Sequence, residues 1–192
     1  MASELHVDAI KHSGGTSAIT INSSGHVHSA GAILQVVQTT DDSDFSMTGS
    51  TFTDFISVAI TPKFNTSKIL IRSTFFGTST SRYGMAKLIR TISGGSATEI
   101  GQGTQGLGSN RTAVFFAIPS NSDVTGDEYV LYNASNEFLD SPSTTSAITY
   151  KIQLANPQTS SATVYANRIE LNNDSAYAPR TKSTITVLEV AQ

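Results

Sequence analysis

Apolar and polar residues alternate along most of the chain, and this period of two indicates β-strands. Runs rich in β-branched and aromatic residues are bounded by Gly, Asn, Ser or Asp, as in strands separated by turns. About ten such runs occur: Ala18–Asn22, Ala32–Thr40, Phe52–Thr61, Lys68–Phe76, Gly84–Ile92, Thr112–Ile118, Glu128–Ala134, Ala147–Ala155, Ala162–Leu171 and Ser183–Val190. No window supports a long amphipathic helix. The pattern therefore predicts an all-β fold, an antiparallel β-sandwich or barrel.

The chain divides near Gly31. Residues 1–31 contain short alternating pieces that are too small to bury a core alone, whereas residues 32–192 hold the longer strands of a self-contained head. We expect the first segment to be a β stem whose apolar residues pack against copies of the same chain. These residues are Leu5, Val7, Ile19, Ile21 and Val27.

The last run, Ser183–Val190, is apolar on both faces of the predicted strand. Ile185, Val187 and Glu189 share one face, and Leu188 and Val190 lie on the other. This predicts a central strand or one that lies against a neighbouring subunit. The Gly-rich segment Ser93–Asn110 is predicted to be the main irregular loop, either a binding loop or a turn with no role.

Composition limits the function classes. The net charge is -3, 14% of the residues are charged, and there is no Lys/Arg cluster, so we expect no nucleic-acid partner. The chain has no cysteine, which excludes disulfides, thiolate zinc sites and cysteine nucleophiles. It also shows no secretion signal and no apolar run long enough to span a bilayer.

Several longer stretches resemble a group of structural proteins of tailed phages, especially phages of marine and cyanobacterial hosts. They are MASELHVDAIKHSGGTSAITINSSG, ILQVVQTTDD, ITPKFNTSKILI, NEFLDSPSTTSAITYKIQLA and STITVLEVAQ. The resemblance covers nearly the whole chain. It implies a small fibre-like virion protein with a short N-terminal β stem and a jelly-roll-like head, forming a homotrimer exposed on the particle. It leaves open whether that protein sits on the tail or on the capsid.

The segment Gly25–His28 carries the one His-x-His spacing in the chain. Residues two apart on a strand project to the same face, so His26 and His28 stand side by side. If both faced the axis of a parallel trimer, their nitrogens would suit an octahedral iron or nickel ion, as the axial sites of some phage fibre tips also imply. The alternative is that Val27 faces inward and both histidines face water, which the apolar pattern of the stem favours.

Enzymatic chemistry has weak support. A Ser-His-Asp hydrolase is excluded because no histidine follows His28 and no G-x-S-x-G elbow occurs. A glycan-degrading enzyme would need facing carboxylates, and the candidate pairs have turn-like flanks that favour solvated loop carboxylates: Asp127 with Glu128, Glu137 with Asp140, and Glu170 with Asp174. Two acidic stretches crudely suggest calcium loops without matching that pattern: Asp41, Asp42 and Asp44, and the segment Asp123–Glu128.

We therefore expect a non-enzymatic protein at the virion surface, a short tail fibre or receptor-binding protein, with a capsid decoration or head-fibre protein as the alternative. The stem would contact other virion proteins. A host-surface glycan or outer-membrane protein would bind through neutral hydrogen-bonding and aromatic side chains of the head loops. Residues with this chemistry are Arg82, Tyr83, Asn110, Arg111, Asn172, Asn173 and Tyr177; each could equally pack against the rim of its own sandwich.

Overall fold

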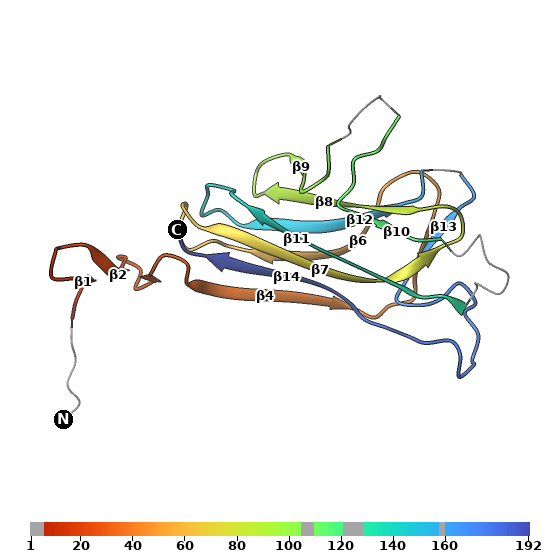
Figure 1. The fold of residues 1–192 in the computed structure, drawn as a ribbon. Coiled ribbons are helices and arrows are strands. Elements are labelled where there is room, and N and C mark those ends of the chain that lie inside the picture. Colours follow the sequence, from red (N-terminus) through yellow and green to blue (C-terminus); the bar gives the residue numbers. More distant parts are fainter. Residues whose placement is uncertain (1–5, 105–109, 121–128, 158–159) are drawn as a thin grey trace.

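The computed structural model describes residues 6–104, 110–120, 129–157 and 160–192. These residues form an antiparallel all-β structure of two layers with a small extra sheet at one end (Figure 1). The predicted all-β sandwich is therefore confirmed. Across the described ranges, no helix is long and apolar enough to cross a membrane.

One layer of the sandwich is a five-stranded sheet in the order β10-β8-β12-β6, with β9 paired to β8. Its strands are β6 (Thr53–Ile60), β8 (Gly84–Ile92), β9 (Ala97–Ile100), β10 (Phe116–Ile118) and β12 (Ile148–Ala155).

The other layer is a six-stranded sheet in the order β4-β14-β7-β13-β5, with β11 paired to β7. Its strands are β4 (Ile33–Asp41), β5 (Phe45–Thr48), β7 (Lys68–Ser79), β11 (Tyr132–Asp140), β13 (Thr163–Ala166) and β14 (Ser183–Val190). The chain crosses between the layers at the connections β5–β6, β6–β7, β7–β8, β10–β11, β11–β12 and β12–β13. Residues distant in sequence therefore meet in one core.

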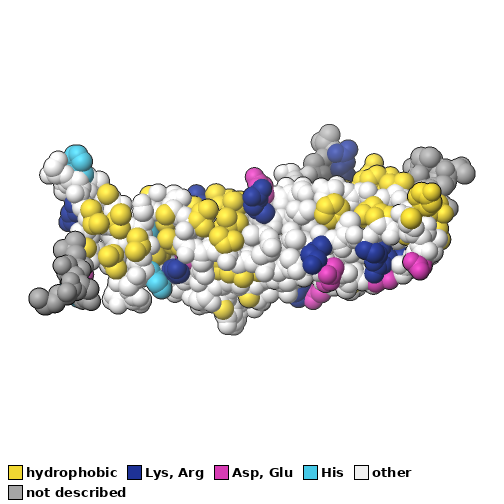
Figure 2. Space-filling model, turned by 90° about the horizontal axis from the view of Figure 1, so that it is seen from below, with side chains coloured by type: hydrophobic (Ala, Val, Ile, Leu, Met, Phe, Trp, Pro, Cys, Tyr) yellow, Lys and Arg dark blue, Asp and Glu magenta, His cyan; other side chains and the backbone are white. Residues whose placement is uncertain are grey.

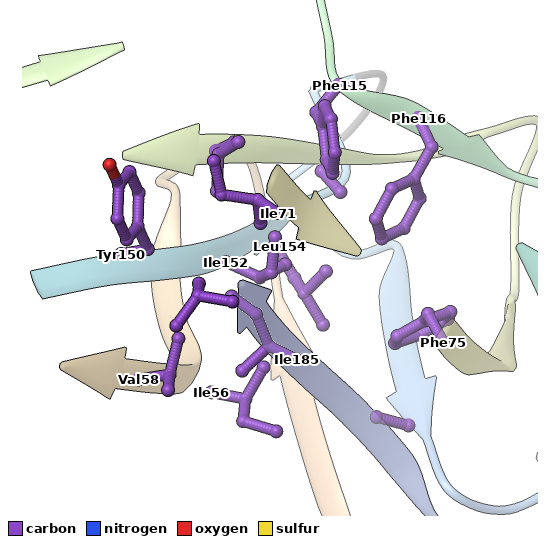
Figure 3. Packing of buried hydrophobic residues seen from close by; sticks show 14 of the residues in the cluster. Ile56, Val58, Ile71, Phe75, Phe115, Phe116, Tyr150, Ile152, Leu154 and Ile185 are labelled. Carbon is purple, nitrogen blue, oxygen red and sulfur yellow. The ribbon is translucent and has the colours of Figure 1, made fainter. Parts of the chain in front are cut away.

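The core lies between the inner faces of the two sheets, where every second residue of a strand is apolar (Figure 3). Ile152 on β12 and Ile185 on β14 are almost fully buried from opposite layers. At one end, Phe75 lies between two other rings, with centroids 5.7 Å from both Phe55 and Phe116. The Phe55–Phe75 pair packs edge-on and the Phe75–Phe116 pair is tilted, which are favourable arrangements for aromatic rings.

The third sheet contains β1 (Ala9–Lys11), β2 (Ser17–Ile21) and β3 (Val27–His28) in that order. It projects from one end of the sandwich, in line with the long strands (Figure 1). A backbone hydrogen bond joins the two parts, because Gly31 N–H donates to the Ala191 carbonyl at 2.9 Å. Beside it, Ala191 N–H donates to the carbonyl of Ala32, the residue that follows Gly31, also at 2.9 Å. We refer to residues 6–31 as the stem and to the two-layered sandwich as the head.

Several observed strands differ from the predicted ones. Strands β10 and β13 are shorter than the predicted runs Thr112–Ile118 and Ala162–Leu171, and β1 and β3 were not among the predicted runs. The expected loop Ser93–Asn110 contains β9, which pairs with β8. The strand expected at Glu128–Ala134 begins instead at Tyr132 and continues to Asp140 as β11, because its mixed side chains hide the alternation. Strand β5 was not predicted. Runs with clear alternation on a buried face, Gly84–Ile92 and Ser183–Val190, have the predicted bounds.

A close approach at Gly77 gives a test of the fold. This residue pairs with β11 on one side and with β13 on the other, and a Cβ there would collide with the Tyr165 carbonyl oxygen and the Phe75 ring. We expect Gly77→Ala to lower the free energy of unfolding by about 1–3 kcal/mol in urea denaturation, because overpacking forces neighbouring groups to move. Gly103→Ala is the control, since no atom of the described residues lies within 4 Å of its Cβ position. Equal stability of both variants would contradict the packing at β7.

Candidate functional site

The stem has one apolar face. Ile10 pairs with Ile19 across β1 and β2, and Ile21 pairs with Val27 across β2 and β3. Directly paired residues, and residues two apart on a strand, lie on the same side of a sheet. All four side chains therefore share one side, which we call the stem face. Ile10 and Val27 are 50% and 51% exposed, so the part of the chain that the structure describes leaves these two side chains uncovered.

This geometry agrees with the expectation that the stem residues Ile19, Ile21 and Val27 would share an apolar surface. Val7 is also exposed, at 36%. Leu5, expected in the same set, lies outside the described residues. Packing against copies of the chain stays a prediction.

His26 and His28 lie on the opposite side of the stem from the stem face. His28 pairs with Thr20, and both residues are adjacent in sequence to the Ile21–Val27 pair. Adjacent residues of a strand point to opposite sides, so His28 points away from the stem face. The rings of both histidines meet Phe64 of the head edge-on, with centroids 4.9 Å away for His28 and 6.2 Å for His26. The imidazoles therefore pack at the junction between stem and head and are half-buried, whereas the alternative in the sequence analysis had them facing water.

The iron or nickel site at His26 and His28 stays a prediction. Across the described residues, no group of three or more His, Cys, Asp and Glu side chains could hold a metal ion within one chain. Nδ1 of His26 is buried and has no hydrogen-bond partner there. An axial ion would require the histidine side of the stem to face the axis, and then the stem face would point away from it.

Glu189 holds the loop that carries Phe64, and sequence reasoning missed this role. Its side chain is fully buried, and its carboxylate accepts hydrogen bonds from the backbone N–H groups of Lys63 and Phe64 at 2.8 and 3.2 Å. The Gln35 amide donates to the other carboxylate oxygen at 2.6 Å. The available signal was an acid at an inward position of an otherwise apolar strand face. Three donors compensate the carboxylate for its lost hydration.

We expect Glu189→Leu to lower the free energy of unfolding by about 2–4 kcal/mol, because it leaves buried donors without an acceptor. Glu189→Gln keeps one acceptor oxygen and nearly the same volume, so its loss should be smaller. Urea denaturation of the full chain measures both. If the leucine variant matched the parent, these N–H groups would have another acceptor and the carboxylate would not be needed.

The carboxylate pair Glu137 and Asp140 does not have glycosidase geometry. Both lie in β11, three residues apart, so their side chains project to opposite sides of the sheet. Glu137 faces outward and pairs with Arg72 at 3.4 Å. Asp140 faces inward, where Arg90 binds both of its oxygens and the Tyr150 hydroxyl donates to one at 2.8 Å. Asp140 is thus part of a structural network.

The other acidic candidates are placed differently. Asp174 is exposed in the connection between β13 and β14, where Glu170 also lies. Asp127, Glu128 and the segment Asp123–Glu128 fall outside the described residues. In the turn after β4, the carboxylates already have protein partners: Asp41 accepts from Ser43, Asp42 pairs with Lys182, and Asp44 pairs with Arg168 and Arg180. These contacts support the interpretation as an acidic turn between strands.

The Asp140 network makes stability depend on pH at the alkaline end. Burial, together with the Asp140 carboxylate, raises the pKa of Tyr150 far above its usual 10.0. Because the unfolded chain then loses this proton first, the stabilising contribution is complete below pH 10 and falls as the pH rises further, by up to about 1.4 kcal/mol per pH unit.

We therefore expect Tyr150→Phe to be less stable than the parent by about 1 kcal/mol at pH 7, since a hydrogen bond is lost. The difference should shrink between pH 10 and 11.5. Urea denaturation across this range measures it. A constant difference would show that Tyr150 ionises equally in the folded and unfolded chains.

The candidate ligand residues of the head fall into two regions. Arg82 and Tyr83 lie in the β7–β8 turn, and Asn172, Asn173 and Tyr177 lie in the β13–β14 connection; both reach the end of the head opposite the stem (Figure 1). Asn110 and Arg111 lie in the connection between β9 and β10.

Their side chains differ in availability. Tyr83 and Tyr177 are 58% and 78% exposed. Asn172 is partly engaged, since it donates to Asp44 and accepts from Arg180. Asn172 therefore packs against the rim of its own sandwich, which was the alternative to ligand binding. The side chains of Tyr83 and Tyr177 are accessible to a partner.

The outer face of the six-stranded sheet contains a polar concavity that the sequence did not indicate. Side chains of β4, β7, β11 and β14 line it, including Gln38, Arg72, Thr74, Ser135, Glu137 and Thr186. The Gln38 amide donates to the Thr186 hydroxyl at 2.7 Å. The surface offers hydroxyl and amide groups with little net charge.

No protein-family model matches the chain, and no curated protein sequence matches it. Among solved structures, the chain is similar to one described as infectious bursal disease virus Gx strain, at 12% identity and a TM-score of 0.43, covering 97% of this chain and 42% of that one. A second is the VP2 subviral particle of the same virus, at 14% identity and a TM-score of 0.35, covering 82% and 41%. The chain thus spans less than half the length of these proteins, and similarity at this level carries no functional conclusion.

Proposed function

We propose that this chain is a structural protein exposed on the surface of a phage virion, a homotrimeric short tail fibre or receptor-binding protein. The observation that carries the proposal is the one-sided stem: three short strands with an apolar face on which Ile10 and Val27 stay half-exposed among the described residues. Small isolated sheets of this kind are marginally stable in water. Identical copies around a common axis would bury that face, and the resemblance to tailed-phage proteins supports three of them.

The arrangement of stem and head suits attachment at one end and recognition at the other. The stem extends from one end of the long sandwich and would contact other virion proteins. The opposite end carries turns with the exposed Tyr83 and Tyr177 (Figure 1). Tyrosine combines a flat apolar ring with a hydroxyl, which suits a glycan or an outer-membrane protein on the host surface.

Labelling intact particles with an antibody against the purified chain, located by electron microscopy, tests this function. We expect label at the tail, because a fibre docks its stem into the tail. Label distributed over the capsid would overturn the tail-fibre assignment and favour a decoration or head-fibre protein. Particles without label, under conditions where the antibody binds the purified chain, would contradict a virion role altogether.

A further inference from the structure

A row of apolar side chains crosses the outer face of the six-stranded sheet. Val36 on β4 pairs with Leu188 on β14, Leu188 pairs with Leu70 on β7, and Leu70 pairs with Leu139 on β11. Paired residues stand side by side, so the four form a continuous line from one edge of the sheet to the other. Val36 is 57% exposed and Leu139 is 47% exposed. We call these four residues the apolar row.

The row continues toward the stem. Val190 follows Leu188 on the outer face of β14, and it pairs with Ile33, which is 57% exposed. The space-filling view of this side shows apolar side chains over the stem and over the adjacent part of the head (Figure 2). The stem face and the apolar row therefore belong to one elongated surface. Monomeric proteins rarely expose contiguous apolar patches larger than a few hundred Å².

The character of the surface changes beyond the row. The next line across the same four strands is polar: Gln38, Thr186, Arg72 and Glu137. It is followed by hydroxyl-bearing residues alone: Thr40, Thr184, Thr74 and Ser135. On the side away from the stem, two polar lines therefore border the apolar row.

The charges on this face favour a second copy of the chain as its occupant. Arg72 and Glu137 are both well exposed and form an ion pair at 3.4 Å, so both signs occur side by side. Two copies of such a face can therefore pack together without like-charge repulsion. The face also lacks the excess of positive charge that binding to anionic lipids or nucleic acids requires.

We propose that the apolar row is a contact surface between identical heads, continuous with the contact between their stems. This inference rests on the proposed homotrimer and assigns the part of the head that takes part in it. Each head turns the outer face of its six-stranded sheet toward its neighbours. The heads pack closely beside the stem, where the face is apolar, and the hydroxyl-rich lines farther along leave room for water between copies.

The double variant Val36→Lys with Leu139→Lys tests the contact. Both positions are exposed in the single chain, so lysine can reach water there and the subunit should fold normally. In an assembled contact, two unpaired ammonium groups would be buried. We expect the dissociation constant of the full chain to rise about a hundredfold or more. Sedimentation velocity and light scattering over a range of concentrations measure it, and circular dichroism verifies folding.

The matched control is Ala59→Lys with Ala117→Lys, which adds two lysines to exposed positions on the outer face of the five-stranded sheet. It should assemble like the parent. Assembly of the Val36/Leu139 variant at parental strength would overturn the contact. So would a parent chain that stays monomeric at about 100 μM, a result that would assign the face to a different protein.

The variant Ile21→Asp separates this inference from the proposed function. If Ile21→Asp dissociates the chains and the Val36/Leu139 variant does not, the chains associate through the stem alone. That result would contradict the head contact and leave the proposed fibre function intact. If the Val36/Leu139 variant dissociates the chains but antibody finds no site on the virion, the contact stands and the proposed function fails.

Discussion

Most of this structure depends on β14, which pairs with β4 on one side and with β7 on the other. Both faces of this strand carry apolar side chains, so each face needs a surface that covers it. Its inward side chains Ile185 and Val187 complete the core, and the last inward side chain, Glu189, binds the loop that supports the stem. Its outward Leu188 stands at the centre of the apolar row. A strand with period two cannot be apolar on both sides unless each side has something to cover it.

Much of the fold could be predicted from the sequence where burial imposes a pattern. Strand β14 has a fully buried inner face and β8 buries its first three inward residues, and the bounds of both follow directly from the alternation. Strand β11 could not be bounded in this way, because Asn133, Ser135 and Glu137 face outward and their turn-like composition resembles a loop. Strand β9 has no buried residue to impose a pattern, so pairing with β8 alone defines it.

In the candidate site, too, local features could be predicted from the sequence and contacts between distant residues could not. The one-sidedness of the stem is local in sequence, and the alternation in Ile19 and Ile21 was sufficient to indicate it. The contact of His26 and His28 with Phe64 joins residues that lie far apart along the chain, and no local signal reports such a meeting. The partners of Glu189 are equally remote. The sequence shows that Glu189 stands on an apolar strand face. Only the tertiary structure shows that the backbone N–H groups of Lys63 and Phe64 donate to it.

The direction of the strands has a mechanical consequence. The stem leads directly into β4, which runs along the length of the head and is paired with β14 over its whole extent. Tension between the stem and the far end of the head would act parallel to these strands. It would load the interstrand hydrogen bonds in shear, so that many must break together, whereas a perpendicular pull would peel them apart one at a time. The head is therefore oriented to withstand a pull along its length.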